Sequence, residues 1–322
     1  MSLPDNISVI NIVPVLNIDR IEVSLKTEVV YWLKKNDIDV ENLICKDEIN
    51  NFKDVQHVVL VDHHVSPFHE SVVSVLDHRP FDSDSNLGVN CKIQLKEVGS
   101  CCTLVIDLIK KDVILNDMKE EYSEVLKLLY AAIVLDTINF SKYADRFRPL
   151  DVEIVENIEQ YLNIENIEEH RKILFDKLVE ARSDISSLNS LQILSKDLKI
   201  ISNKDNSVRV ALSAVLLPEY VLLANAAENL KYFVEKNDID VISLMSMRTE
   251  HDTVTRDFGL VDIKNKQLFD DVCTRRLYTI IKFKSILIFR SNQLWKGIKL
   301  QVLDSLELTS VFSMESFTIN PM

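Results

Sequence analysis

Two short apolar runs, each ending in an aspartate followed by a histidine, constrain the fold of this chain more than any other feature. The first run is VVLV before Asp62, and the second is VVSVL before Asp77. β-Branched runs bounded by polar loops are typical of strands that are buried on both faces of a parallel sheet. Because the carboxyl ends of neighbouring parallel strands meet at one edge, these runs predict an α/β fold with a ligand site there.

The residue types that follow the two runs suit a divalent metal ion. These residues are Asp62, His63 and His64 after the first run and Asp77, His78 and Arg79 after the second. A strand-end carboxylate is able to bridge two cations, and imidazole nitrogens complete such a site. We therefore expect Asp62 and His78 to bind metal, with Asp77 orienting the imidazole ring. The forked guanidinium of Arg79 suits phosphate oxygens.

Each group, taken alone, also has a simpler interpretation. An isolated Asp-His-His sequence is more often a turn cap flanked by surface histidines, and Asp77 also fits a salt-bridged strand end. Five of the seven histidines lie between residues 56 and 79. The repetition of the Asp-His step within this segment favours the metal site.

Two further positions are candidates for the same site. Asp136 ends the apolar run LLYAAIVLD, so its carboxylate needs a cation or several hydrogen-bond donors. Gly99 and Ser100 open a predicted helix, whose free backbone N–H groups attract an anion such as phosphate. The alternatives are a solvent-facing carboxylate at Asp136 and an ordinary N-cap at Ser100.

The composition limits the classes of partner. The net charge of −13 argues against nucleic acid and anionic membranes, because both attract clustered Lys and Arg. Neither GxxxxGK[ST] nor GxGxxG occurs, which excludes P-loop and dinucleotide motifs. The five cysteines form no CxxC pair, so we expect reduced thiols. With no basic amino-terminal segment and no apolar run of about 18 residues, we expect a cytoplasmic protein without a membrane partner.

The length of 322 residues and the change in pattern after a charged helical segment predict two domains. The predicted strands, besides those before Asp62 and Asp77, cover residues 8–18, 43–46, 91–96, 208–215, 241–246 and 278–289. The predicted helices cover residues 22–35, 100–111, 122–135 and 222–236, and residues 151–181 are also helical. We place the first domain at residues 1–174, a smaller α/β domain at 175–306 and a tail at 307–322.

The order of the motifs resembles the DHH phosphoesterase superfamily. These motifs are VDHH, LDHRP, KEVGSCCTLV and AAIVLDTINF. Together with PVLNIDRIEV and KDEI, they are most similar to the prune proteins, which are related to exopolyphosphatases and family II inorganic pyrophosphatases. The resemblance covers residues 13–306. It implies a DHH-type parallel sheet flanked by helices and a smaller carboxyl-terminal domain that closes over the site.

The resemblance also implies roles for individual residues. It implies Mn²⁺ or Mg²⁺ as cofactor and a phosphoanhydride substrate, namely short-chain polyphosphate or pyrophosphate. The implied metal ligands are Asp62, His78 and Asp136. The implied catalytic residues are His63, His64 and Asp77. The implied phosphate-binding residues are Arg79, Gly99, Ser100, Arg256, Lys296 and Lys299.

Two departures from the family pattern matter for activity. The family's first motif, an Asn or His followed by Asp-x-Asp, is not found before PVLNI, and Gly297 stands where relatives have a substrate-binding arginine. We therefore expect this chain to release little phosphate from short polyphosphates. The alternatives to an active hydrolase are a catalytically impaired prune-like binding or regulatory protein that acts through protein partners, and a truncated isoform or gene model.

Overall fold

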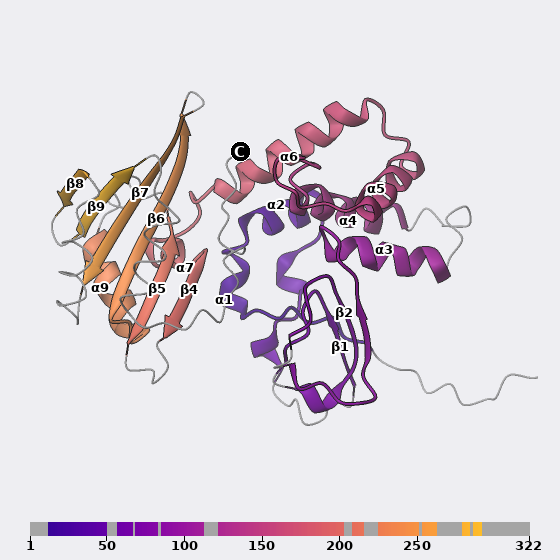
Figure 1. The fold of residues 1–322 in the computed structure, drawn as a ribbon, viewed down its shortest axis with the longest axis horizontal. Coiled ribbons are helices and arrows are strands. Elements are labelled where there is room, and N and C mark those ends of the chain that lie inside the picture. The colour runs from indigo at the N-terminus through magenta and orange to yellow at the C-terminus, as the bar shows by residue number, and fades with distance from the viewer. Residues whose placement is uncertain are drawn as a thin grey trace, which may run out of the picture. The chain divides into compact units, whose positions relative to one another are not determined.

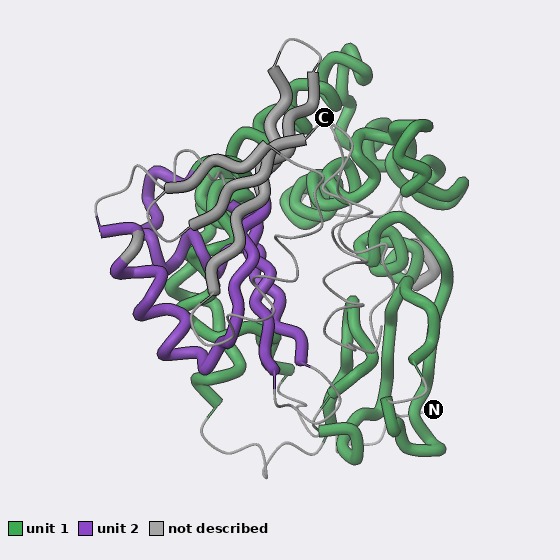
Figure 2. Tube along the Cα trace, turned by 60° about the vertical axis from the view of Figure 1, so that its left-hand side comes forward, with its two compact units in different colours: residues 1–184 green, residues 185–322 purple. Residues whose placement is uncertain are grey.

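The computed structural model describes residues 12–49, 57–66, 68–82, 85–112, 122–202, 208–215, 225–250, 253–262, 279–283 and 286–291. The chain divides into two compact units, residues 1–184 and 185–322, which Figure 2 shows in different colours. Among the described residues, no helix combines the length and the apolar character that a bilayer span requires.

The first unit contains a three-stranded parallel sheet in the order β1-β2-β3 (Figure 1). The strands are β1 (Val58–Val61), β2 (Val72–Asp77) and β3 (Lys92–Leu95). This sheet, flanked by helices, confirms the predicted α/β class. Val61 pairs with Leu76, so β1 and β2 end at the same level. Asp62, which follows β1, and Asp77, which ends β2, therefore lie at one edge of the sheet.

The helices of the first unit largely follow the predicted ranges. They are α1 (Arg20–Val23), α2 (Thr27–Lys35), α3 (Cys101–Asp112), α4 (Tyr122–Asp136), α5 (Pro149–Tyr161) and α6 (Ile167–Ser183), with 3₁₀ turns η1 (Val40–Asn42), η2 (Lys46–Glu48) and η4 (His69–Ser71). The charged segment 151–181, predicted to be helical, consists of two helices, and Asn163 and Asn166 between them adopt left-handed backbone conformations.

Two amino-terminal predictions were too simple. The predicted strand at residues 8–18 is only an isolated bridge between Leu16 and Cys45 in its described part. The predicted helix at residues 22–35 is broken into α1 and α2. Helix α1 starts at the capping box of Asp19 and Glu22 and ends at Val23, and α2 starts at Thr27.

The core of the first unit lies among α3, α4, α5 and α6. Helix α4 is apolar on most sides and is therefore buried between its neighbours. Leu174 and Leu178 of α6 pack into the same core. The predicted domain boundary after residue 174 lies inside α6, and the structure divides after this helix because these two leucines bind it to the first unit.

The second unit contains a mixed six-stranded sheet in the order β4-β5-β6-β7-β9-β8. Its strands are β4 (Leu198–Ser202), β5 (Arg209–Ala214), β6 (Val241–Glu250), β7 (Thr253–Asp262), β8 (Thr279–Phe283) and β9 (Ile286–Ser291), and its helices include α7 (Ser190–Ser195) and α9 (Ala226–Lys236). The single strand predicted at residues 278–289 is instead the antiparallel pair β8 and β9. The predicted tail at 307–322 lies outside the described residues.

Candidate functional site

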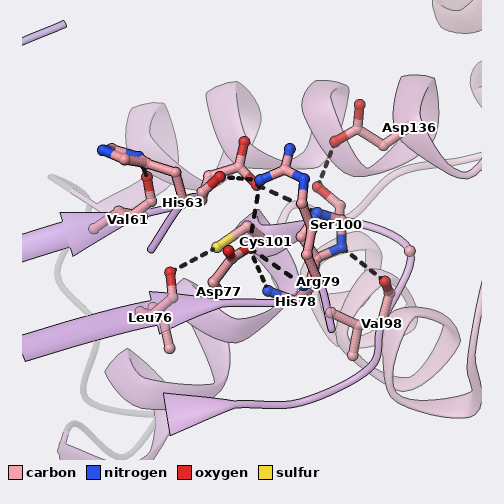
Figure 3. Close-up of polar contacts among 12 residues, drawn as sticks. Val61, His63, Leu76, Asp77, His78, Arg79, Val98, Ser100, Cys101 and Asp136 are labelled. Atoms are coloured by element: carbon pink, nitrogen blue, oxygen red, sulfur yellow. Dashed lines mark hydrogen bonds and ion pairs between the residues drawn. The ribbon is translucent and has the colours of Figure 1, made fainter. Parts of the chain in front are cut away.

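The carboxyl edge of β1 and β2 brings the two Asp-His groups together, as Figure 3 shows. The backbone N–H of Asp62 donates to the Leu76 carbonyl at 2.9 Å, which continues the sheet one residue beyond β1. Asp62 itself has a φ of 66°, a left-handed conformation that is strained for most side chains but tolerated by aspartate. This turn carries the Asp62 carboxylate toward the side chains that follow β2.

Asp62 and His78 form the centre of the site. The Nε2 atom of His78 lies 3.2 Å from Oδ1 of Asp62, and its Nδ1–H donates to the Val98 carbonyl at 2.9 Å. A carbonyl is only an acceptor, so this contact assigns a proton to Nδ1 and directs Nε2 toward Asp62. An imidazole fixed in this way by an outer acceptor is ready to bind a cation through its other nitrogen.

The pKa values of this pair move in opposite directions. The hydrogen bond with Asp62 raises the pKa of His78 although partial burial opposes the change, and the Val98 carbonyl contributes in the same upward direction. Partial burial raises the pKa of Asp62, but the contact with His78 and the charge of Arg79 outweigh it, so the pKa is lowered. In the absence of a cation, the site therefore favours a charged carboxylate beside a charged imidazole.

Arg79 lies across both aspartates. Its Nη1 donates to the backbone carbonyl of Asp62, lies 3.4 Å from Oδ1 of Asp62 and lies 3.4 Å from Oδ1 of Asp77. The side chain is still 52% exposed. Arg79 thus offsets negative charge at the strand edge while part of its surface remains available to a ligand.

Asp77 and His64 form a buried pair rather than an open catalytic group. Nδ1 of His64 donates to Oδ2 of Asp77 at 2.6 Å, and its Nε2 accepts the backbone N–H of Asp82 at 2.9 Å. The ring also stacks on Phe81, with centroids 5.7 Å apart. Both nitrogens of His64 are therefore used within the protein. Asp77 was expected to orient the ring of His78, but its carboxylate orients His64 instead.

His63, by contrast, lies partly in solvent. Its Nδ1 is 3.0 Å from the Val61 carbonyl, which fixes a proton on that atom and leaves Nε2 as the basic nitrogen. The contrast follows from the contacts of the two rings, because His64 is buried against Asp77, whereas His63 contacts the Val61 carbonyl and remains partly exposed.

Asp136, the last residue of α4, is held by Ser100. The Ser100 hydroxyl donates to Oδ2 of Asp136 at 2.7 Å, and Figure 3 shows the second carboxylate oxygen directed away from Ser100. The pKa of Asp136 is raised, chiefly by desolvation of the carboxyl group and further by the Asp62 charge, while the Ser100 hydrogen bond opposes the change; the residue as a whole is nevertheless exposed. A bound cation would relieve this unfavourable proximity of like charges.

The predicted anion site at the start of α3 contains a carboxylate of the protein itself. Oδ2 of Asp151 accepts the Gly99 N–H at 2.7 Å, and its Oδ1 accepts the Ser100 N–H at 3.4 Å. The Gly99 and Ser100 amides predicted to bind phosphate are thus paired with Asp151 in this structure. The cap comes from Asp151 on α5 rather than from Ser100 itself, whose hydroxyl donates to Asp136.

The thiols beside the site are not in their reactive form. Burial, together with the Asp62 charge, raises the pKa of Cys101 to about 12. Burial, together with the Asp136 charge, raises the pKa of Cys102 to about 11. Both cysteines therefore stay protonated near neutral pH, and thiolate ligation is not favoured.

Within the described part of the chain, Asp62, Asp77 and His78 are the side chains whose ligand atoms cluster within 4.8 Å of one another. Two carboxylates and one imidazole are a donor set that suits Mn²⁺ or Mg²⁺. The set includes Asp62 and His78, two of the predicted metal ligands, whereas Asp136 is not part of this tight group, and its role as a ligand stays a prediction.

The remaining predicted phosphate ligands belong to the second unit. Arg256 lies in β7, where its backbone pairs with Met247 and Ser291. Lys296 and Lys299 lie outside the described residues. The roles of these three residues stay predictions.

Sequence reasoning missed two parts of the site. The Val98 carbonyl, which selects the His78 tautomer, carries no side-chain signal. Asp151 did carry a local sequence signal. It follows Pro149, the first residue of α5, and a proline followed by an acid in the first turn is typical of a helix start. Its long-range contact with Gly99 was not visible from that pattern.

Comparisons with known proteins agree with the motif order. Residues 176–287 match the DHHA2 domain family. Exopolyphosphatase PRUNE1 of Homo sapiens is 32% identical over 248 residues, covering 73% of this chain and 52% of the human protein. The protein of the same name from Mus musculus is 32% identical over 238 residues, covering 70% of this chain and 47% of the mouse protein. The chain spans about half the length of the curated relatives it matches.

A solved structure supports the fold. A Methanococcus jannaschii protein assigned to the family II inorganic pyrophosphatases aligns with a TM-score of 0.53 and 18% sequence identity. The alignment covers 87% of this chain and 88% of that protein. At this identity, the similarity concerns the fold alone.

Proposed function

Because this chain is a prune-like member of the DHH phosphoesterase superfamily, we propose that it carries a metal-dependent site for hydrolysing phosphoanhydride bonds in short-chain polyphosphate or pyrophosphate. One observation supports this most directly. His78 presents Nε2 to Asp62 at 3.2 Å while its other nitrogen is bonded to the Val98 carbonyl, which is the arrangement of an imidazole prepared for a cation.

We assign Asp62, His78 and Asp136 to the metal ion. Their oxygen and nitrogen donors fit Mn²⁺ or Mg²⁺. A bound cation of this kind supplies Lewis-acid polarisation of a phosphoryl oxygen and makes water a stronger acid. Cation binding requires an unprotonated Nε2 on His78, so the proton shared with Asp62 leaves when the ion binds.

We assign the other roles in the proposed reaction to neighbouring residues. Arg79 offsets the negative charge of a phosphate group, because its guanidinium is half exposed beside Asp62. His63 exchanges a proton through its basic Nε2, and the buried His64–Asp77 pair keeps the loop after β1 in place. Arg256, Lys296 and Lys299 are proposed to contact more distant phosphates of the substrate.

Metal binding is the first test of this proposal. Titration calorimetry with Mn²⁺ should show binding to the wild-type chain and an affinity more than about 100-fold lower for Asp62→Ala, since losing a direct ligand costs more than losing an outer partner. Glu70→Ala, which removes an exposed carboxylate before the amino end of β2, is the control and should bind as the wild type does. Identical isotherms for wild type and Asp62→Ala would remove Asp62 from the metal site.

Phosphate release from pyrophosphate and tripolyphosphate separates the two candidate functions. The observation that favours a binding protein is the small ligand set, since one of the three clustered side chains, Asp77, is fully buried and bonded to His64. An active hydrolase releases phosphate with Mn²⁺ or Mg²⁺, and Asp62→Ala abolishes that release. Mn²⁺ binding with no release above the Asp62→Ala level would instead identify a prune-like binding or regulatory protein.

A further inference from the structure

Asp151 is a buried carboxylate that the proposed function does not use. It is fully buried near the amino end of α5, and it accepts four hydrogen bonds there. The donors are the Gly99 N–H at 2.7 Å, the Ser100 N–H at 3.4 Å, the Thr103 hydroxyl at 2.6 Å and the Arg148 N–H at 2.7 Å. Two of these amides start α3, so Asp151 takes the place that an external anion would occupy there.

The same contacts connect Asp151 to Asp136. Ser100 receives its backbone position from Asp151 and donates its hydroxyl to Oδ2 of Asp136 at 2.7 Å. Gly99 also lies close to the residue after Asp136, because a Cβ at Gly99 would lie 2.8 Å from the side-chain atom Cγ2 of Thr137. A shift in the first turn of α3 would therefore move both the hydroxyl that holds Asp136 and the residue that follows it.

We propose that Asp151 is a positioning residue for Asp136. Asp151 fixes the start of α3 and thereby the position of the Ser100 hydroxyl. This hydroxyl holds Oδ2 of Asp136, so that Oδ1 remains available to the cation. This inference rests on the proposed function, because it requires Asp136 to bind the metal ion. An ordinary N-cap would stabilise the helix without any effect on metal affinity, and this difference makes the proposal testable.

The test compares Mn²⁺ affinity in four forms of the full chain, measured by calorimetry at a temperature where circular dichroism shows each to be folded. The forms are wild type, Asp151→Asn, Ser100→Ala and the double variant. The isosteric amide replaces one of the two acceptor oxygens by an NH2 group, so either the Gly99 and Arg148 N–H groups or the Ser100 N–H group loses its acceptor. Asp151→Asn should therefore lower the affinity about 10- to 100-fold, as loss of an outer partner of a metal ligand does.

Additivity gives the sharper readout. If Asp151 acts through Ser100, the double variant loses no more affinity than the worse single variant, whereas independent effects multiply. Glu156→Gln, an exposed carboxylate on the same helix, is the control and should leave the affinity unchanged. Unchanged Mn²⁺ affinity in Asp151→Asn, with only a lower thermal midpoint, overturns the proposal and leaves a simple helix cap.

The outcomes distinguish this inference from the function on which it rests. Loss of binding in Asp62→Ala with full binding in Asp151→Asn rejects the positioning role alone. Equal binding by wild type and Asp62→Ala rejects the metal site itself. If Asp151→Asn does not fold, Ser100→Ala decides, since it retains the Asp151 carboxylate, and full Mn²⁺ affinity in that variant rejects the proposed connection.

Discussion

Two clusters of charged side chains in the first unit contain similar residue types in opposite surroundings. At the strand edge, the side chains of Asp62 and Arg79 are 53% and 52% exposed. Among the helices, the side chain of Glu159 is fully buried and that of Arg171 is 18% exposed. Both clusters pair a carboxylate with a guanidinium, yet only the strand-edge cluster leaves large parts of its charged groups in water.

The buried cluster satisfies its charges within the protein. Arg171 donates to both oxygens of Glu159, through Nε to Oε1 and through Nη2 to Oε2 at 2.6 Å. The Tyr130 hydroxyl donates to Oε1 at 2.9 Å, and burial beside Glu159 raises the pKa of this tyrosine. The guanidinium also lies 5.0 Å from the centroid of the Phe140 ring. These contacts connect α4, α5 and α6.

The comparison separates charges that support the fold from charges that are available to a ligand. A buried charge is tolerated only when partners within the protein satisfy it, so its removal leaves an unpaired group in the core. Half-exposed charges contribute little to stability because water screens them. The strand-edge cluster is therefore expected to affect ligand binding, and the buried cluster is expected to affect the free energy of unfolding.

The largest effect is expected from breaking the buried cluster. Glu159→Ala leaves Arg171 without its carboxylate and Tyr130 without its acceptor, and should lower the free energy of unfolding by about 3–5 kcal/mol. Urea denaturation measures this change. The neighbouring surface variant Lys172→Ala, whose side chain is 71% exposed, should change stability by less than about 0.5 kcal/mol. A loss below about 1 kcal/mol for Glu159→Ala would contradict the role assigned to the cluster.

A smaller effect is expected when the charge is kept but its geometry is changed. Arg171→Lys retains a cation beside Glu159 but loses the two-pronged contact and the planar group over Phe140, so it should lower the free energy of unfolding by about 1–2 kcal/mol. The same urea experiment applies. If lysine proves as stable as arginine, then charge alone, and not the paired hydrogen bonds, explains the stability of the cluster.

The smallest effect is expected at the strand edge in metal-free protein. Asp62→Asn, measured with a chelator present, should change stability by no more than about 1 kcal/mol because the carboxylate is half exposed. The pH dependence of this change has a defined window. His78 has a raised pKa, so its contribution is present below its ordinary pKa of 6.5 and is lost as the pH rises through the folded value.

The pKa of Asp62 sets the lower pH limit of this stability difference. Its pKa is lowered, so its contribution is present above its ordinary value of 3.8 and is lost as the pH falls through the folded value. The difference in thermal midpoint between wild type and Asp62→Asn should therefore be largest between about pH 4 and 6.5 and should shrink toward pH 8. A difference that grows from pH 6 to pH 8 would show that the pair does not interact as described.

Much of the architecture of the first unit could be predicted from local patterns. The apolar runs before Asp62 and Asp77 are strands, and the segment after Gly99 is a helix, because periodicity and burial act over a few residues. The break between α1 and α2 and the division after α6 could not be predicted in the same way. The division after α6 depends on contacts between segments, such as the packing of Leu174 and Leu178 against the other helices.

The amino-acid sequence by itself determined the chemistry of the candidate site, because the repeated Asp-His step specifies which donor atoms reach one edge of a parallel sheet. Only the tertiary structure decided which donors remain open. It paired His64 with Asp77, placed Asp151 against the Gly99 amide and selected the His78 tautomer through the Val98 carbonyl. The physical reason is that hydrogen-bond satisfaction in a folded chain depends on partners far apart in sequence, and residue types alone do not specify those partners.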